Sequence, residues 1–76
     1  MFNKESFNSM LKARNIEFAY RGMKVNVCGK DGKLIGNYGH NLLVRFDGVK
    51  GTANCHPHYM AKYYDEQGNL IKEYKD

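Results

Sequence analysis

The chain has 76 residues, a formal net charge of +4 at pH 7, and 42% hydrophobic residues. A chain this short forms one domain and has no room for a catalytic cleft between subdomains, so we expect any site on the surface, in a shallow groove or between subunits. It shows neither a signal peptide nor an apolar run of the roughly 18 residues that a membrane span needs, so we expect a cytoplasmic protein with reduced cysteines.

The basic residues are concentrated in the first two thirds of the chain. Residues 1–25 carry five Lys and Arg against two acids, and residues 26–50 carry four against two, whereas residues 51–76 carry three against four. This distribution favours an anionic partner, but only mildly, because dedicated nucleic-acid binders usually cluster their cations more densely.

The first residues predict a short amphipathic helix. Asn3 is a good N-cap residue, and Phe2 and Phe7 occupy the two positions of a hydrophobic staple. We expect the helix to run from about Lys4 to Arg14 and to close at Asn15, a residue type that tolerates the left-handed conformation. Three turns are marginal in isolation, so the helix must dock on another element.

From Met23 onward the hydrophobic period changes to two, which is typical of strands with one buried face. The expected strands are Met23–Val27, Leu34–Gly39, Asn41–Phe46, Val49–Cys55, Tyr59–Tyr64 and Leu70–Tyr74, with turns at Lys30–Lys33, Asp47–Gly48 and Asp65–Asn69. This spacing favours a small barrel or sandwich. Glycines gather at positions 29, 32, 36 and 39. Because no helix pattern follows them, they predict sharp bending of the sheet rather than a phosphate-binding loop.

The stretch GMKVNVCGKDGKLIGNYGHNLLVRFDG, residues 22–48, resembles the SH3-like small barrels, including KOW-type modules, in its Gly-containing loop and its second strand ending in V-x-F-D-G. The helical start and the YYDEQGNLI hairpin are also similar to small phage and prophage proteins of low-GC Gram-positive bacteria. Together, pattern and resemblance predict a mostly β (α+β) single domain over residues 1–76. A helix in residues 1–16 would pack on a five- to six-stranded antiparallel SH3-like barrel in residues 17–76, with a one-turn helix at HPHYM.

The segment CHPH is the one candidate metal motif. Zinc requires three or four ligands that converge tetrahedrally, and this segment supplies one close pair, Cys55 with His56 or His58. Cys28 and His40 would have to complete the site from across the barrel. We expect no zinc and no cofactor, and we interpret both cysteines as small buried hydrophobic residues.

Catalytic pairs are not indicated by the sequence. Cys55 and His56 are adjacent on an expected strand, so their side chains should point to opposite faces. The acids Asp31, Asp47, Asp65 and Glu66 lie at predicted turns, where the backbone favours them. We therefore expect no enzymatic activity.

Tyrosines next to basic residues form the candidate binding surface. Alternation must push one of the adjacent Tyr63 and Tyr64 outward. The candidate binding residues are Tyr38, Arg45, Lys24, Lys33, Tyr63 and Tyr64. Exposed Tyr beside Lys and Arg can stack bases and neutralise phosphates, but the same residues anchor protein interfaces. They can also be half-buried strand formers and lysines that protect sheet edges.

These observations predict a non-enzymatic binding module, an accessory protein of a phage or mobile element that binds a host protein through its barrel surface. The modest charge, the acidic last third and the resemblance favour a protein partner. Nucleic-acid binding through exposed Tyr, Lys and Arg is the alternative. We expect no membrane partner and a monomer or homodimer.

Overall fold

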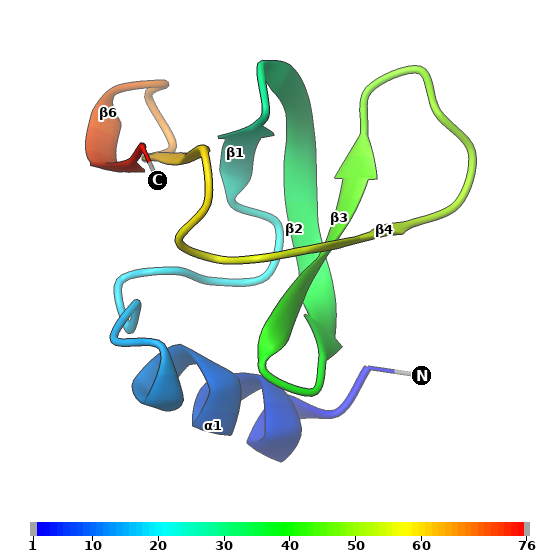
Figure 1. Cartoon of the computed structure of the whole chain (residues 1–76), viewed down its shortest axis with the longest axis vertical. Helices are drawn as coiled ribbons and strands as arrows, with labels where there is room; N and C mark the ends of the chain where they lie inside the picture. Colours follow the sequence, from blue (N-terminus) through cyan, green and yellow to red (C-terminus); the bar gives the residue numbers. More distant parts are fainter. Residues whose placement is uncertain (1, 76) are drawn as a thin grey trace.

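The computed structural model describes residues 2–75, and this part of the chain contains one helix and six strands (Figure 1). In chain order they are α1 (Lys4–Ala13), β1 (Lys24–Val27), β2 (Lys30–Tyr38), β3 (Asn41–Phe46), β4 (Ala53–Cys55), β5 (Ala61–Tyr64) and β6 (Leu70–Tyr74). The strands form one antiparallel sheet in the order β4-β3-β2-β1-β5-β6. The mostly β fold with an N-terminal helix is therefore confirmed. No helix in the described residues is long and apolar enough to cross a membrane.

Helix α1 forms as its capping residues predict. The Asn3 side chain accepts a hydrogen bond of 2.9 Å from the Ser6 N–H, and the Phe2 and Phe7 rings lie 5.4 Å apart. Asn15 adopts φ +61°, which closes the helix. The helix ends at Ala13, with Arg14 as its C-cap residue, so the predicted end was one residue too late.

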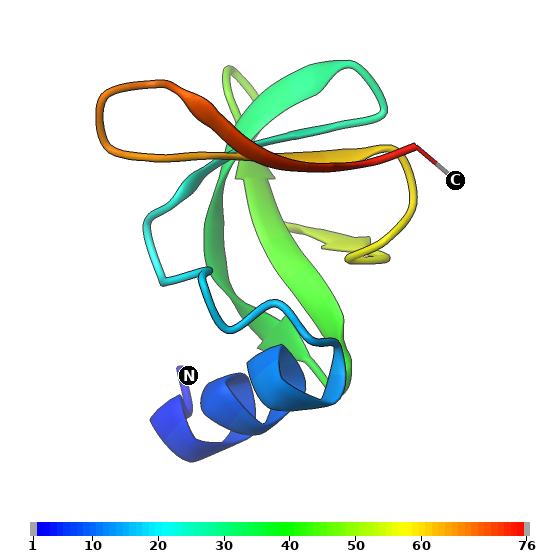
Figure 2. The same ribbon diagram turned by 90° about the vertical axis from the view of Figure 1, so that its left-hand side faces the viewer.

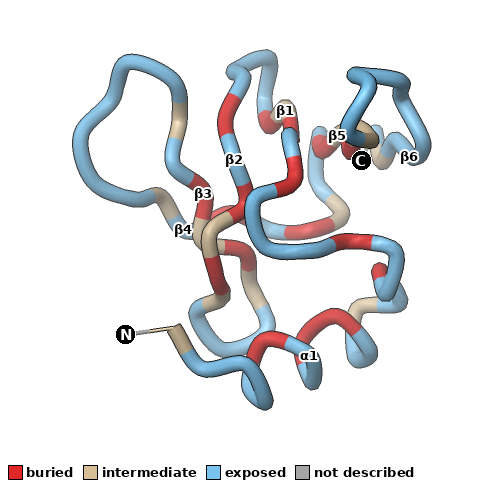
Figure 3. The backbone as a smooth tube through the Cα atoms, turned by 180° about the vertical axis from the view of Figure 1, so that it is seen from behind, coloured by how far each residue is buried: buried red, intermediate tan, exposed pale blue. Residues whose placement is uncertain are grey.

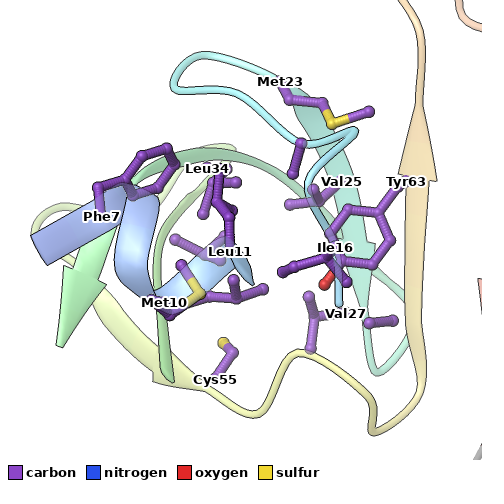
Figure 4. Packing of buried hydrophobic residues seen from close by; sticks show 14 residues of the cluster. Phe7, Met10, Leu11, Ile16, Met23, Val25, Val27, Leu34, Cys55 and Tyr63 are labelled. Carbon is purple, nitrogen blue, oxygen red and sulfur yellow. The ribbon is translucent and has the colours of Figure 1, made fainter. Parts of the chain in front are cut away.

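The core lies between α1 and the inner face of a strongly twisted sheet. The helix contributes Phe7, Met10 and Leu11, and Figure 4 shows these side chains pointing toward the apolar residues of the strands. The buried hydrophobic residues of the strands are Val25, Val27, Leu34, Leu42, Val44, Cys55, Ala61 and Tyr63. Buried and exposed positions alternate along the backbone in Figure 3, as expected for a sheet with one face in the core.

The first hairpin turns earlier than predicted. Residues Lys30–Lys33, expected to form a turn, belong to β2, and the turn consists of Cys28 and Gly29. These two residues have φ values of +54° and +83°. Two successive left-handed residues match the twist of the flanking strands, which is why such two-residue turns are favoured in hairpins. Consequently Lys30 pairs with Val27, and the four residues expected to form the turn are the first four residues of β2.

Two other predictions also need correction. The expected strand Val49–Cys55 is shortened to Ala53–Cys55, because Gly48 and Gly51 both adopt positive φ in the preceding loop. The HPHYM segment forms a turn closed by a 3.4 Å hydrogen bond from the Tyr59 N–H to the His56 carbonyl, and no helix is assigned there. The β5–β6 hairpin lies at the end of the molecule opposite α1 (Figures 1 and 2).

Candidate binding surface on the outer face of the sheet

Three cations lie side by side on the outer face of β1, β2 and β3. Lys24 is the register partner of Lys33, and Lys33 is in turn the partner of Arg45. All three side chains are exposed. Neighbouring strands are about 4.8 Å apart, so three positive charges start from backbone positions within about 10 Å. We call these residues the cation row.

The cation row ends beside an aromatic residue on β5. The Lys24 ammonium lies 5.5 Å from the centroid of the Tyr64 ring, a cation–π geometry. Tyr64 is half-buried and points outward, as one of the two adjacent tyrosines had to do.

Tyr63, by contrast, does not belong to any surface. It is fully buried, and its hydroxyl donates a 2.7 Å hydrogen bond to the Pro57 carbonyl. Its ring packs edge-on against Phe18 at 5.3 Å. Burial raises the pKa of the Tyr63 phenol, with smaller contributions from Tyr74 and Cys55. Its inclusion among the binding residues was wrong, because β5 pairs with β1 in the register that turns Tyr63 toward the core.

A shallow groove runs along the outer face of β2 and β3. One depression of about 530 Å³ lies between the start of α1 and the two strands, and its lining includes Phe2, Arg21, Ile35, Tyr38, Leu43 and Arg45. A second depression of about 480 Å³ shares Ile35 and Arg45 with the first and continues to Lys33, Val49 and Lys50. We call the two together the outer groove. Its lining combines apolar residues, among them Ile35, Leu43 and Val49, which we call the groove floor, with the cations Arg21, Lys33, Arg45 and Lys50.

Arg21 is a groove residue that was not among the predicted candidates. Its Nε donates a 3.0 Å hydrogen bond to the Ile35 carbonyl, and its guanidinium lies 4.3 Å from the centroid of the Phe2 ring. The register of β2 and β3 shifts at Ile35, between Leu34 and Gly36. A bulged residue is unpaired in the ladder, which leaves its carbonyl for a side-chain donor. The bulge therefore fixes Arg21 at the groove.

Acidic residues border this surface at two points. Asp47 lines the second depression, as does Lys50. Asp65 and Glu66 line a separate hollow together with Lys24 and Lys33 of the cation row. The Asp65 carboxylate is occupied within its own turn, where it accepts hydrogen bonds from the N–H groups of Asn69 and Gln67. The bond from Asn69 makes the largest contribution to lowering the pKa of Asp65.

The CHPH segment connects structural elements. The Nε2 of His58 lies 2.7 Å from the Arg14 carbonyl at the end of α1, a hydrogen bond in which the ring nitrogen donates. The His58 ring also packs on Tyr74 of β6 at 4.5 Å. His56 Nδ1 accepts a hydrogen bond from the His58 N–H at 3.0 Å. The segment thus ties the helix end to the last hairpin.

The four residues considered for zinc do not come together. Cys55 is buried, as expected, and burial together with the nearby Cys28 raises the pKa of its thiol. Cys28 is exposed in the β1–β2 turn, so its interpretation as a buried residue was wrong. His40 is exposed in the β2–β3 turn, and His58 contacts the helix end. Within residues 2–75, no three His, Cys, Asp or Glu side chains are placed to hold a metal ion.

Comparisons of the chain with protein-family models, curated proteins and solved structures yield no match. Its function must therefore be argued from the geometry of the outer face.

Proposed function

We propose that this chain is a non-enzymatic binding module whose outer sheet face binds nucleic acid. The observation that carries the proposal is the cation row, in which Lys24, Lys33 and Arg45 are register partners of one another. Like charges directly opposite each other destabilise a sheet. A polyanion lying across the row offsets that repulsion and gains affinity by releasing counterions.

The cation row changes the preferred partner from a protein, which the charge totals favoured, to a nucleic acid. The totals are modest and favoured a protein partner, but they do not show where the charges meet. In the fold, Arg21 and Lys50 lie along the same groove as the cation row residues Lys33 and Arg45. This local density supports a nucleic acid more strongly than a protein of mixed charge.

The proposal also includes the type of fold, an SH3-like small barrel. Strands β1 to β4 form a meander, and β5 joins the sheet beside β1, an order that supports an SH3-like small barrel. The segment that resembles such barrels, residues 22–48, contains β1, β2 and β3. A cytoplasmic accessory role in a phage or mobile element, as the resemblance implies, belongs to the same proposal.

A protein partner is the second candidate, and a different region favours it. Strand β6 is at one edge of the sheet, and its Leu70 and Ile71 are 49% and 46% exposed. An exposed edge strand can pair with a strand of another chain, whether a host protein or a second copy.

Fluorescence anisotropy with labelled oligonucleotides in low salt tests the nucleic-acid proposal. We expect binding that weakens with salt, with a log–log slope of about −2 for three phosphate contacts on a single strand. Lys33→Glu should weaken binding strongly, because it reverses the central charge of the row. Lys75→Glu makes the same charge change beside β6, where Lys75 lines a separate hollow with Glu73, and should have little effect.

Failure to bind any oligonucleotide at low salt would remove the proposal. A pull-down from the host cell with and without nuclease then tests the protein candidate, whose captured partner should be unaffected by nuclease. Equal losses in Lys33→Glu and Lys75→Glu would show that total charge, and not the cation row, governs binding.

A further inference from the structure

We propose that the ligand of the outer groove is single-stranded nucleic acid, with phosphates on the cation row and unpaired bases on Tyr38 and the groove floor. This inference rests on the nucleic-acid binding proposed above and specifies its substrate class.

The apolar floor of the groove distinguishes a single strand from a duplex. Ile35 and Leu43 point outward from β2 and β3 and remain only half-buried, and Val49 is exposed at the far end. A duplex presents mainly phosphates and sugars to a sheet face and keeps its bases stacked inside. Unpaired bases expose their flat faces and can cover apolar side chains. The floor therefore matches a ligand that carries both charge and apolar rings.

Tyr38 is the most exposed aromatic residue described, at 69%. It is the last residue of β2 and lies at the edge of the groove. The turn after it is fixed by Asn37, whose side-chain amide donates to the Gly39 carbonyl at 2.8 Å and to the Ser6 hydroxyl at 3.0 Å. An exposed ring on an ordered turn provides a stacking platform that needs little rearrangement to accept a base.

The spacing of charge and aromatic groups suits an extended strand. Tyr38 pairs with Asn41, and Lys33 pairs with Arg45, so the cation row and Tyr38 are four residues apart along β3. At about 3.4 Å per residue this separation is roughly 14 Å, which a strand of a few nucleotides spans. Arg21 lines the same depression and presents a planar guanidinium that can meet a phosphate.

Three ligands distinguish binding through charge from binding through base stacking: an oligothymidylate, the same strand annealed into a duplex, and inorganic polyphosphate. We expect the single strand to bind tightest. Tyr38→Ala should weaken its binding about 5- to 160-fold, the loss of one stacked base, and leave polyphosphate binding unchanged. Tyr38→Phe should restore single-strand binding because it keeps the ring. Tyr59→Ala is the matched control, since Tyr59 is 52% exposed and lies between β4 and β5.

Each alternative result has a definite meaning. Equal binding of single strand and duplex, with no effect of Tyr38→Ala, overturns the inference and leaves nucleic-acid binding itself intact. Polyphosphate binding as tight as oligothymidylate binding also overturns it, because charge alone would then suffice. Absence of binding to all three ligands removes both the inference and the function on which it rests.

Discussion

The two faces of the β1–β3 sheet differ in residue composition, although their residues alternate along the same strands. The inner face carries five apolar residues that are at most 4% exposed: Val25, Val27, Leu34, Leu42 and Val44. The outer face places three cations in direct register. Burial of apolar area explains the inner face. Folding does not explain the outer face, because register-paired like charges weaken a sheet. This arrangement is the reason for proposing that the outer face binds a polyanion.

Neighbouring residues on β5 show the same contrast. Tyr63 packs in the core and its hydroxyl is bonded to the Pro57 carbonyl. Tyr64, one residue later, faces outward beside the Lys24 ammonium. Tyrosine thus packs in the core on one face of β5 and lies beside a cation on the other face. Substitutions on the two faces should have opposite effects on stability.

The largest effect is expected for Gly32→Ala. A Cβ at Gly32 would lie 2.7 Å from the Arg45 carbonyl oxygen and 2.9 Å from Val44 Cγ1, so β3 would have to move. Overpacking of this kind costs about 1–3 kcal/mol, and a chain of this size holds only a few kcal/mol in reserve. Urea unfolding followed by circular dichroism should show a large loss of stability.

Gly36→Ala is the matched control on the same strand. A Cβ there would meet Phe2 at 3.6 Å, which is ordinary contact, and Gly36 has no positive φ. We expect a change of less than about 1 kcal/mol. Equal stabilities of the two variants would contradict the close approach of β2 and β3 at Gly32.

An intermediate effect that depends on pH is expected for Tyr63→Phe. At pH 7 the variant should lose about 1 kcal/mol, because the Pro57 carbonyl loses its donor. Burial raises the folded-state pKa of Tyr63, so folding favours the protonated phenol. That contribution is complete below the unfolded pKa of about 10 and is lost as pH rises further, by roughly 1.4 kcal/mol per pH unit. By about pH 11 the variant should equal or exceed the wild type in stability.

Unfolding free energies measured from pH 7 to 11 for both proteins test this crossing. The raised pKa of Cys55 acts in both proteins, so the difference between them isolates Tyr63. Tyr64→Phe, on the outer face, leaves the Tyr63–Pro57 hydrogen bond in place and serves as the control variant. Parallel curves for wild type and Tyr63→Phe would mean that the phenol titrates without unfavourable burial.

The sequence predicted the elements governed by local chemistry. The Asn3 cap, the Phe2–Phe7 staple and the closure at Asn15 each depend on residues within a few positions, and the structure has all three. The last hairpin was also predictable, because Asp65 caps its own turn. Local hydrogen bonds form in the same way whatever the rest of the fold does.

The cation row could not be predicted, although its three residues were all candidates. A turn at Lys30–Lys33 would have removed Lys33 from the sheet. Only the turn at Cys28 and Gly29 places Lys33 between Lys24 and Arg45. Cys-Gly is not a favoured turn pair in the way that Asn-Gly is, so composition gave no signal.

Two other features of the site depend on tertiary register. Alternation required one outward tyrosine, but the pairing of Tyr63 with Val25 decides which. Arg21 joins the groove through the bulge at Ile35, whose position depends on how β2 meets β3. The glycine cluster predicted bending of the sheet, but it did not show that the bulge would lie at Ile35.

The smallest expected effect is a gain in stability for Lys33→Glu. The substitution replaces two like-charge pairs with opposite-charge pairs, to Lys24 on one side and to Arg45 on the other. Cross-strand pairs contribute roughly 0.2–1 kcal/mol each, so we expect a net gain of about 0.5 kcal/mol at low salt. The gain should shrink as salt screens the exposed charges. Thermal unfolding at two salt concentrations measures both quantities.

Lys75→Glu provides the reference for the change in net charge, because it lies outside the cation row. If Lys33→Glu is no more stable than Lys75→Glu, the three cations do not repel one another, and the main reason for assigning the outer face to a polyanion disappears. If Lys33→Glu is more stable and also loses oligonucleotide binding, the residue at position 33 opposes folding while supporting binding. No property of the isolated sheet would produce that combination.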